Sequence, residues 1–153
     1  MIGQERVLVL DIDGTLCPTR RPDQSYADLI PDAAMLKRLL EYRADGYRVV
    51  LHTARQMRTY DGNVGELNAH MLPVLTAWLD RHGVPYDEIH VGKPWPGRDG
   101  FYVDDRTVRP AEFLALTAEQ ISALLDRDAV ADADAPPTRF AGEQDQAAEE
   151  RPR

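Results

Sequence analysis

Residues 6–15 read RVLVLDIDGT. After Arg6 the run is apolar and rich in branched side chains, which is typical of a buried parallel strand. Two carboxylates, Asp11 and Asp13, follow at once, and Gly14 then allows the backbone to turn sharply. We therefore expect a strand that delivers two acids to the edge of a sheet.

The rest of the chain alternates between strand and helix patterns. Three further short apolar runs, at 47–52, 88–91 and 100–103, predict strands, and helices are predicted at 31–44, at 73–82 and from 117 to about 127. This alternation predicts an α/β fold with an open, mainly parallel sheet and helices on both of its faces.

The overall composition narrows the class of protein. Of the 153 residues 43% are hydrophobic, and no apolar run approaches the roughly 18 residues that span a bilayer, so we expect no membrane contact. The net charge of −8 works against binding of nucleic acid. Cys17 is the only cysteine, and the first residues lack the basic-then-apolar plan of a signal peptide. These features predict a cytoplasmic protein.

The last part of the sequence differs from the rest. Residues 126–153 hold eight acidic and four basic residues and almost no large apolar side chain. Such a composition buries too little apolar surface to offset the entropy lost on ordering. We expect one domain over residues 1–125 and a disordered acidic tail over 126–153.

Polar side chains stand at or just beyond the end of each predicted strand. Sites in open parallel sheets gather at the carboxyl ends of the strands, so we expect these groups to converge. They are Asp11 and Asp13, Thr53, Lys93, and Asp104 with Asp105. Three or four carboxylates in a small space demand a cation or shared protons, and ligands that are all oxygen indicate Mg²⁺.

The same groups suit phosphoryl transfer. The Thr53 hydroxyl can donate a hydrogen bond, and Lys93 supplies a compact positive charge for a phosphate oxygen. A carboxylate that approaches a phosphate dianion at ~3.5 Å meets a repulsion of about 9 kcal/mol at an effective dielectric of 20, which a metal and a lysine would offset. An in-line carboxylate nucleophile divides one difficult displacement into two easier ones through an aspartyl-phosphate.

These motifs, in this order, resemble the four motifs of the haloacid dehalogenase (HAD) superfamily. The resemblance implies a Rossmann-like fold in which Asp11 is the nucleophile and Asp13 the general acid and base. It further implies that Thr53 and Lys93 hold the substrate phosphate. The metal site that it implies for Mg²⁺ consists of Asp11, Asp13 through its backbone carbonyl, and Asp104, with Asp105 in support. An aspartate two positions after the nucleophile indicates a phosphatase, a hydrolase of phosphate monoesters, rather than a dehalogenase.

Three longer stretches are similar to the small capsule-biosynthesis phosphatases of this superfamily: TARQMRTYDGNVG at 53–65, GKPW at 92–95 and YVDDRTVRPAEF at 102–113. That resemblance implies a sugar phosphate or polyol phosphate as the substrate, in surface-polysaccharide or sugar biosynthesis.

The spacing of the motifs leaves no room for a large cap domain. Only 42 positions separate Asp11 from Thr53, and 40 separate Thr53 from Lys93, and predicted helices and strands fill most of them. We expect a capless enzyme with a flap within residues 16–29. Its open site would admit a bulky substrate or be covered by another subunit of a homo-oligomer.

Four polar residues beside the motifs are further candidates for substrate contact. They are Thr15, which would also assist Asp13, and Arg55, Asn63 and Arg106. Asn63 has an alternative role, because its spacing from Glu66 also fits a helix cap.

Two other functions stay open at this point. One is a phosphatase that acts on nucleic-acid ends, which the capless, polynucleotide-directed branch of the superfamily suggests and the net charge of −8 opposes. The other is a non-catalytic partner protein that keeps a phosphate pocket, for which Asp13 would have no use.

Overall fold

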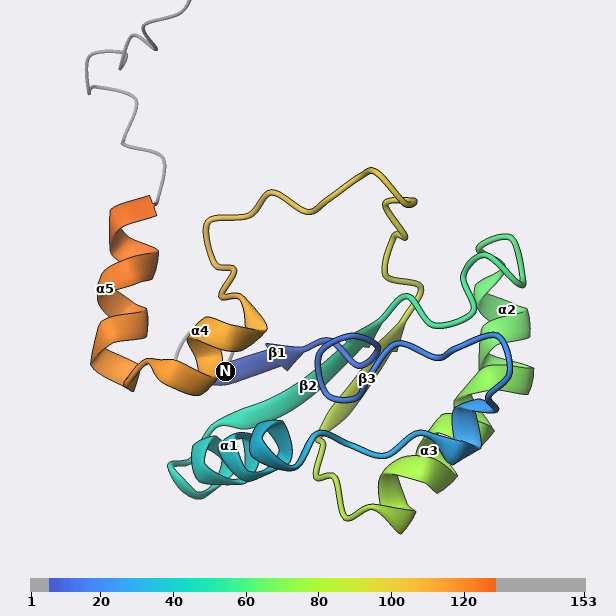
Figure 1. The fold of residues 1–153 in the computed structure, drawn as a ribbon, viewed down its shortest axis with the longest axis horizontal. Helices are drawn as coiled ribbons and strands as arrows, with labels where there is room; N and C mark the ends of the chain where they lie inside the picture. The colour runs from blue at the N-terminus through green and yellow to red at the C-terminus, as the bar shows by residue number, and fades with distance from the viewer. Residues whose placement is uncertain (1–5, 129–153) are drawn as a thin grey trace, which may run out of the picture.

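A three-stranded parallel sheet lies at the centre of the computed structural model, which describes residues 6–128 (Figure 1). Its strands are β1 (Val7–Leu10), β2 (Arg48–Thr53) and β3 (Glu88–Val91), in the order β1-β2-β3. Val9 pairs with Val50, and Leu51 pairs with Ile89. The prediction of an α/β fold with a parallel sheet is confirmed.

The two long crossover helices cover one face of this sheet. They are α1 (Ala33–Ala44), between β1 and β2, and α3 (Leu72–Arg81), between β2 and β3. Right-handed crossovers that add strands in one direction place both helices on the same side. On the opposite face, Val7 and Val9 are 43% and 58% exposed. Within residues 6–128, the expectation of helices on both faces is therefore not met.

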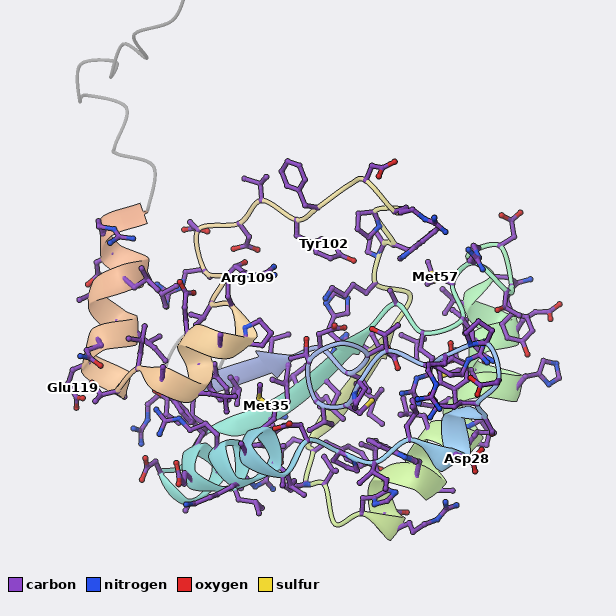
Figure 2. The ribbon with its side chains drawn as sticks, in the orientation of Figure 1. Asp28, Met35, Met57, Tyr102, Arg109 and Glu119 are labelled. Carbon is purple, nitrogen blue, oxygen red and sulfur yellow. The ribbon has the colours of Figure 1, made fainter. Side chains whose placement is uncertain are left out.

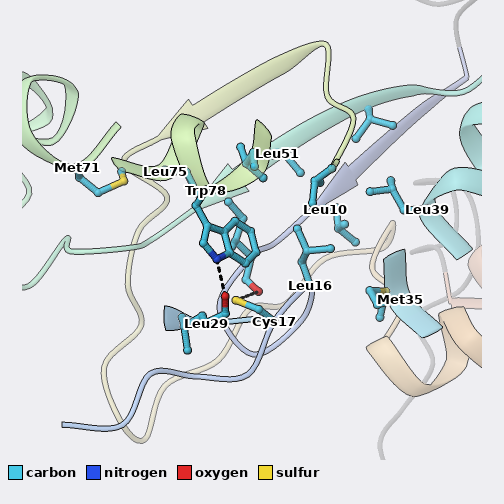
Figure 3. Close-up of a cluster of buried hydrophobic side chains, with 14 of the residues drawn as sticks. Leu10, Leu16, Cys17, Leu29, Met35, Leu39, Leu51, Met71, Leu75 and Trp78 are labelled. Carbon is cyan, nitrogen blue, oxygen red and sulfur yellow. Dashed lines mark hydrogen bonds between the residues drawn. The ribbon is translucent and has the colours of Figure 1, made fainter. Parts of the chain in front are cut away.

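The hydrophobic core lies between the sheet and these helices (Figure 3). Leu51 from β2 and Leu39 from α1 are fully buried, as are Leu75 and Trp78 from α3. The indole nitrogen of Trp78 donates a hydrogen bond of 2.7 Å to the carbonyl oxygen of Leu29. This bond ties the segment before α1 to the core.

Helix α1 begins and ends close to the predicted positions. The carboxylate of Asp32 accepts a hydrogen bond of 2.8 Å from the backbone nitrogen of Met35, which caps the first turn. Gly46, two residues past the end of the helix, has a φ of 88°. A side chain would oppose that conformation, so a glycine at this position helps to end the helix.

The second helical region is longer than the predicted 73–82. It runs through α2 (Val64–Glu66), a π-helical segment η2 (Leu67–Met71) and then α3. Pro73 lies in the first turn of α3 and has no N–H to donate to the preceding turn. The wider π turn before it changes the hydrogen-bond register, because the backbone nitrogen of Leu72 donates to the carbonyl of Leu67.

The prediction of a fourth strand at 100–103 is wrong. That segment contains no strand, and Phe101 and Val103 are 80% and 87% exposed. Pro94 and Pro96, with Gly97 and Gly100, precede the aromatic run and disfavour ladder pairing. Figure 1 shows the chain arching away from the sheet between β3 and α4.

Two short helices close the described part of the chain. Helix α4 (Pro110–Ala115) was not predicted, although Pro110 in its first turn and Glu112, which accepts from the backbone nitrogen of Arg109, are start signals. Helix α5 (Ala118–Asp128) confirms the predicted last helix and takes in the first three residues of the predicted tail. From residue 129 on, the tail prediction falls outside the described residues. Among residues 6–128, no helix combines the length and apolar character that crossing a membrane requires.

Candidate functional site

A cleft of about 480 Å³ opens at the carboxyl ends of β1 and β2. Four segments line it: the turn after β1, the predicted flap at 16–29, the loop 54–59 after β2, and the segment that follows β3. The residues that line it and bear charge are Asp11, Asp13, Arg20, Arg55, Arg58 and Lys93. Strand ends thus bring together the first acidic pair and the lysine, as the sequence predicts.

The turn after β1 fixes both carboxylates. Gly14 has a φ of 81°, and a Cβ there would lie 3.2 Å from Thr19 Oγ1, so the position favours glycine on two grounds. Its backbone nitrogen donates to the carbonyl of Cys17 over 2.8 Å, which closes the turn. Thr15 Oγ1 lies 3.3 Å from Asp11 Oδ2, so this hydroxyl is beside Asp11 rather than Asp13.

Asp11 faces Lys93 across the cleft. The Lys93 Nζ atom lies 3.4 Å from Asp11 Oδ1, and the two side chains are 18% and 29% exposed. The lysine backbone is held against β2, because its nitrogen donates to the carbonyl of Thr53 over 3.1 Å. Its ammonium group also lies 4.5 Å from the ring centre of Tyr102. The cation is therefore held beside one carboxylate, in reach of an anion that approaches it.

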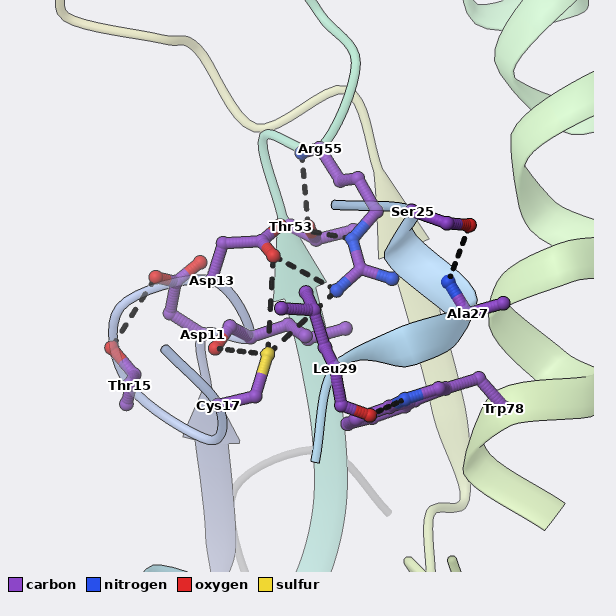
Figure 4. Close-up of polar contacts among 11 residues, drawn as sticks. Asp11, Asp13, Thr15, Cys17, Ser25, Ala27, Leu29, Thr53, Arg55 and Trp78 are labelled. Carbon is purple, nitrogen blue, oxygen red and sulfur yellow. Dashed lines mark hydrogen bonds and ion pairs between the residues drawn. The ribbon is translucent and has the colours of Figure 1, made fainter. Parts of the chain in front are cut away.

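Asp13 has a different and more buried partner, Arg55 (Figure 4). Arg55 Nε and Nη2 donate to the two carboxylate oxygens over 2.9 and 2.8 Å, and the arginine side chain is 2% exposed. The guanidinium lies 4.6 Å from the ring centre of Tyr26 and 5.8 Å from that of Trp78. Arg55 was predicted to contact substrate, whereas the structure engages it with Asp13.

Thr53 ends β2 directly behind this pair. It is 1% exposed, and its hydroxyl oxygen accepts a hydrogen bond of 3.0 Å from the backbone nitrogen of Arg55. Thr53 is therefore next to the cleft but is not among the residues that line it. Its hydroxyl organises the turn that carries Arg55.

The second acidic pair does not join the first. Asp104 and Asp105 are exposed, do not line the cleft, and lie on the segment that contains no strand. The Asp104 carboxylate accepts a hydrogen bond of 2.7 Å from the backbone nitrogen of Arg106, so it stabilises its own turn. Arg106 is exposed and likewise lies outside the cleft. Asn63 caps α2, because its side chain accepts from the backbone nitrogen of Glu66 over 3.2 Å.

The donor chemistry at the cleft suits Mg²⁺ only in part. Asp11 presents carboxylate oxygens, the ligand type that this ion prefers, whereas both carboxylate oxygens of Asp13 accept from Arg55. Within residues 6–128, no three His, Cys, Asp or Glu side chains are arranged so that they could hold a metal ion together. In this arrangement Asp11 and Asp13 are the residues that would hold the ion, and the role of Asp104 and Asp105 as ligands stays a prediction.

Cys17, a buried residue in the turn after β1, carries the thiol nearest to the two carboxylates. Burial, followed by the nearby carboxylate of Asp13, raises the pKa of the Cys17 thiol to about 11. The thiol is thus neutral at physiological pH and a poor nucleophile. On the opposite face of the sheet, burial and the positive charge of Lys93 lower the pKa of His52, whose ring packs 6.4 Å from that of His90. Asp11 is the carboxylate in the cleft that arginine does not hold.

The sequence analysis missed part of the cleft lining. Arg20 and Tyr26, from residues 16–29, and Tyr102, from the segment after β3, all contribute to it. Figure 2 shows Tyr102 on that segment and Met57 on the loop after β2. Arg20 and Tyr26 carry no motif, and only the expectation of a flap within 16–29 placed their segment at the site. Burial raises the pKa of Tyr102, and the Asp11 charge adds to this effect.

Comparison with known proteins identifies a similar protein of solved structure. No protein-family model matches the chain, and the search of curated proteins found no match. The crystal structure of an MCSG target from Vibrio cholerae superposes with a TM-score of 0.76 at 49% sequence identity. The match covers 81% of this chain and 99% of the other. At that identity and coverage, this chain belongs to the same protein family as the Vibrio cholerae protein.

Proposed function

We propose that this protein is a Mg²⁺-dependent phosphomonoesterase of the HAD superfamily that works through an aspartyl-phosphate. The proposed substrate is a sugar phosphate or polyol phosphate, in the biosynthesis of surface polysaccharide or of sugars. The fold class and the motif order support the reaction type, and the narrower sequence resemblance supports the substrate class.

The observation that carries the proposal is the pairing of each strand-end carboxylate with a different cation. Asp11 has Lys93 at 3.4 Å and keeps 29% of its side chain exposed, which suits a nucleophile. Asp13 is held by both of its oxygens on Arg55, which suits a group that must keep one orientation. A simple turn that ends a strand would need neither arrangement.

The proposed reaction has two displacements at phosphorus. In the first, an Asp11 oxygen attacks phosphorus and the bond from phosphorus to the ester oxygen breaks, while Asp13, which enters this step protonated, gives its proton to the departing alcohol. In the second, Asp13 takes a proton from water, whose oxygen attacks phosphorus and releases inorganic phosphate and Asp11. Lys93 neutralises charge on the phosphate throughout.

Arg55 contributes to this scheme through Asp13. A carboxylate that is fixed on both oxygens by an arginine can still accept a proton on a lone pair that points away from it. The pair therefore suits the second step, in which Asp13 acts as a base. We assign Arg55 as a positioning residue rather than a substrate ligand.

Mg²⁺, when bound by Asp11 and Asp13, would add positive charge next to the phosphate and lower the repulsion between it and Asp11. Once Arg55 is assigned to Asp13, the groups placed next to the reacting phosphate are one carboxylate, Asp11, and one ammonium, Lys93, so the two charges of the phosphate dianion stay without a counterpart there. This charge balance is the physical reason to expect a metal requirement.

Release of inorganic phosphate tests the proposal. Wild type and Asp11→Asn are compared on a panel of sugar phosphates, nucleotides and 3′-phosphorylated oligonucleotides, with Mg²⁺ and with a chelator. We expect Mg²⁺-dependent hydrolysis of sugar phosphates, and a loss of more than about 10³-fold in Asp11→Asn with the thermal midpoint retained, since the nucleophile is removed. Activity confined to oligonucleotides would replace the substrate class, and full activity in Asp11→Asn would refute the covalent scheme.

A further inference from the structure

The charges that line the cleft do not balance. It holds two carboxylates, Asp11 and Asp13, and four cations. Lys93 pairs with Asp11 and Arg55 pairs with Asp13. The other two cations, Arg20 and Arg58, form no ion pair with a carboxylate within residues 6–128. Two unbalanced positive charges therefore remain in the cleft of a protein whose net charge is −8.

The first of these cations, Arg20, is held in place by its own segment. Its Nη1 atom donates to the carbonyl oxygens of Gln24 and Arg21 over 2.7 and 3.2 Å. The guanidinium lies 5.0 Å from the ring centre of Tyr26, and the Nε atom is buried and has no hydrogen-bond partner in the structure. The charge is thus fixed before any ligand binds, which reduces the entropy lost on binding.

The second cation, Arg58, lies on the loop after β2. Its guanidinium is 5.6 Å from the ring centre of Trp95, which also lines the cleft. Two non-glycine residues of this loop, Gln56 and Asp61, have φ values of 59° and 49°. Backbone in this region costs free energy and persists where surrounding structure enforces it, often at ligand sites. Gln56 itself lines the cleft.

We propose that the cleft takes a phosphate ester that carries a second anionic group, a carboxylate or a further phosphate, and that Arg20 and Arg58 bind this group. The inference rests on the proposed function, because Asp11 and Lys93 take the phosphate that reacts. Guanidinium groups match carboxylate and phosphate oxygens in geometry. A neutral sugar ring would offer these two guanidinium groups no anionic group of their own, apart from the phosphate that Asp11 and Lys93 take.

Matched substrate pairs test this inference at constant ionic strength. Glucose 6-phosphate is compared with 6-phosphogluconate, which adds a carboxylate, and fructose 6-phosphate with fructose 1,6-bisphosphate, which adds a phosphate. We expect wild type to show a KM about tenfold lower for the doubly anionic member of at least one pair, which corresponds to about 1.4 kcal/mol. The pair that responds identifies the second group as carboxylate or phosphate.

Variants then assign the preference to residues. In Arg20→Gln, Arg58→Gln and the double variant, the ratio of KM values within the responding pair should fall towards one. The matched control is Arg21→Gln, the neighbouring exposed arginine that pairs with Asp23 and does not line the cleft, and it should keep the wild-type ratio. Equal KM values within both pairs in wild type would overturn the inference. A ratio that survives in the double variant, or an equal rise in KM for both members, would also overturn it.

A binding measurement separates failure of this inference from failure of the proposed function. Calorimetric titration of the same four compounds into Asp11→Asn needs no turnover. Tighter binding of the doubly anionic member, lost when Arg20→Gln and Arg58→Gln are added, supports the second-anion site even if no compound is hydrolysed. Equal affinities within both pairs overturn it even if wild type hydrolyses them all.

Discussion

The two acidic pairs of this chain have the same chemistry and opposite surroundings. Asp11 and Asp13 follow a strand in the sheet, and each faces a cation across the cleft. Asp104 and Asp105 follow an apolar run that pairs with no strand in the described residues 6–128, and both are exposed. The first pair is held by side chains from elsewhere in the chain, whereas the Asp104 carboxylate bonds to a backbone N–H two residues on.

The difference indicates that carboxylates at the end of an apolar run form a site only when the run pairs with a neighbouring strand and packs against the core. β1 has a neighbour, β2, and an inner face that packs against the core through Leu10. The run at 100–103 has Phe101 and Val103 in solvent instead. Cations supplied from two other segments, Arg55 and Lys93, then fix the direction of the carboxylates.

Arg55→Gln is expected to have the largest effect on stability among the changes that test the contrast between the two acidic pairs. It would leave the Asp13 carboxylate without its buried partner, so we expect a loss of about 3 kcal/mol in unfolding free energy. The same change should lower kcat about tenfold or more with little change in KM, because Arg55 acts through Asp13. Chemical denaturation and steady-state kinetics measure the two effects.

The control for this prediction is Arg21→Gln, whose side chain is 69% exposed and should change stability by no more than about 0.5 kcal/mol. Adding Arg55→Gln to Asp13→Asn should cost almost nothing further in kcat, since the two residues work as a unit. Fully additive losses in kcat, or a rise in KM alone, would return Arg55 to the role of a substrate ligand.

Removal of a third carboxylate, in Asp87→Asn, is expected to have an intermediate effect on the unfolding free energy. It accepts from the backbone nitrogen of Val49 over 2.7 Å and pairs with Arg43, and the Val49 bond, followed by Arg43, lowers the pKa of its carboxyl. A lowered pKa in the folded state adds stability above the unfolded pKa of about 4, and this stability is lost as pH falls through the folded value. Asp87→Asn should lower the unfolding free energy by about 1 kcal/mol at pH 7. In chemical denaturation at a series of pH values, the unfolding free energy of the variant should also fall less than that of wild type as the pH is lowered below about 4. An equal fall in unfolding free energy at acid pH in wild type and Asp87→Asn would contradict this account.

The smallest expected effect on stability belongs to Asp104→Asn and Asp105→Asn. Both side chains are exposed, so the unfolding free energy should change by no more than about 0.5 kcal/mol, against several times that for Arg55→Gln. Denaturation curves at pH 7 measure this. The Mg²⁺ concentration for half-maximal activity, measured on the same variants, shows whether the two pairs work together: a rise of tenfold or more would break the contrast drawn here and support the predicted ligand set.

Local patterns were sufficient for most of the fold. Strand 88–91, helix α1, which begins within two residues of the predicted 31–44, and the last helix, predicted from 117, each depend on residues within a few positions. The run at 100–103 has the same apolar character as the true strands, and what it lacks is a partner strand, which local sequence does not encode. The expectation of helices on both faces failed for a similar reason. Which face a helix covers depends on the order of the strands in the sheet, which local sequence does not encode either.

For the candidate site, the sequence predicted which residue types meet and missed how they pair. Asp11, Asp13 and Lys93 were expected to converge because strand order brings strand ends together. The partnership of Asp13 with Arg55 depends on side-chain directions across 42 positions and on the burial of Arg55 against Tyr26 and Trp78. No spacing rule in the sequence encodes that geometry.

The central claim is that Asp11 attacks phosphorus while Asp13 serves the second step. Its most direct test is the Asp13→Asn variant with 4-nitrophenyl phosphate and Mg²⁺, stopped rapidly in acid and analysed by peptide mass spectrometry. This leaving group needs no proton, so the first step should proceed and the second should stall. We predict a burst of nitrophenolate that matches the amount of enzyme, and one phosphoryl group on Asp11. An unmodified Asp11 in Asp13→Asn, while wild type turns over the same ester, would contradict the account.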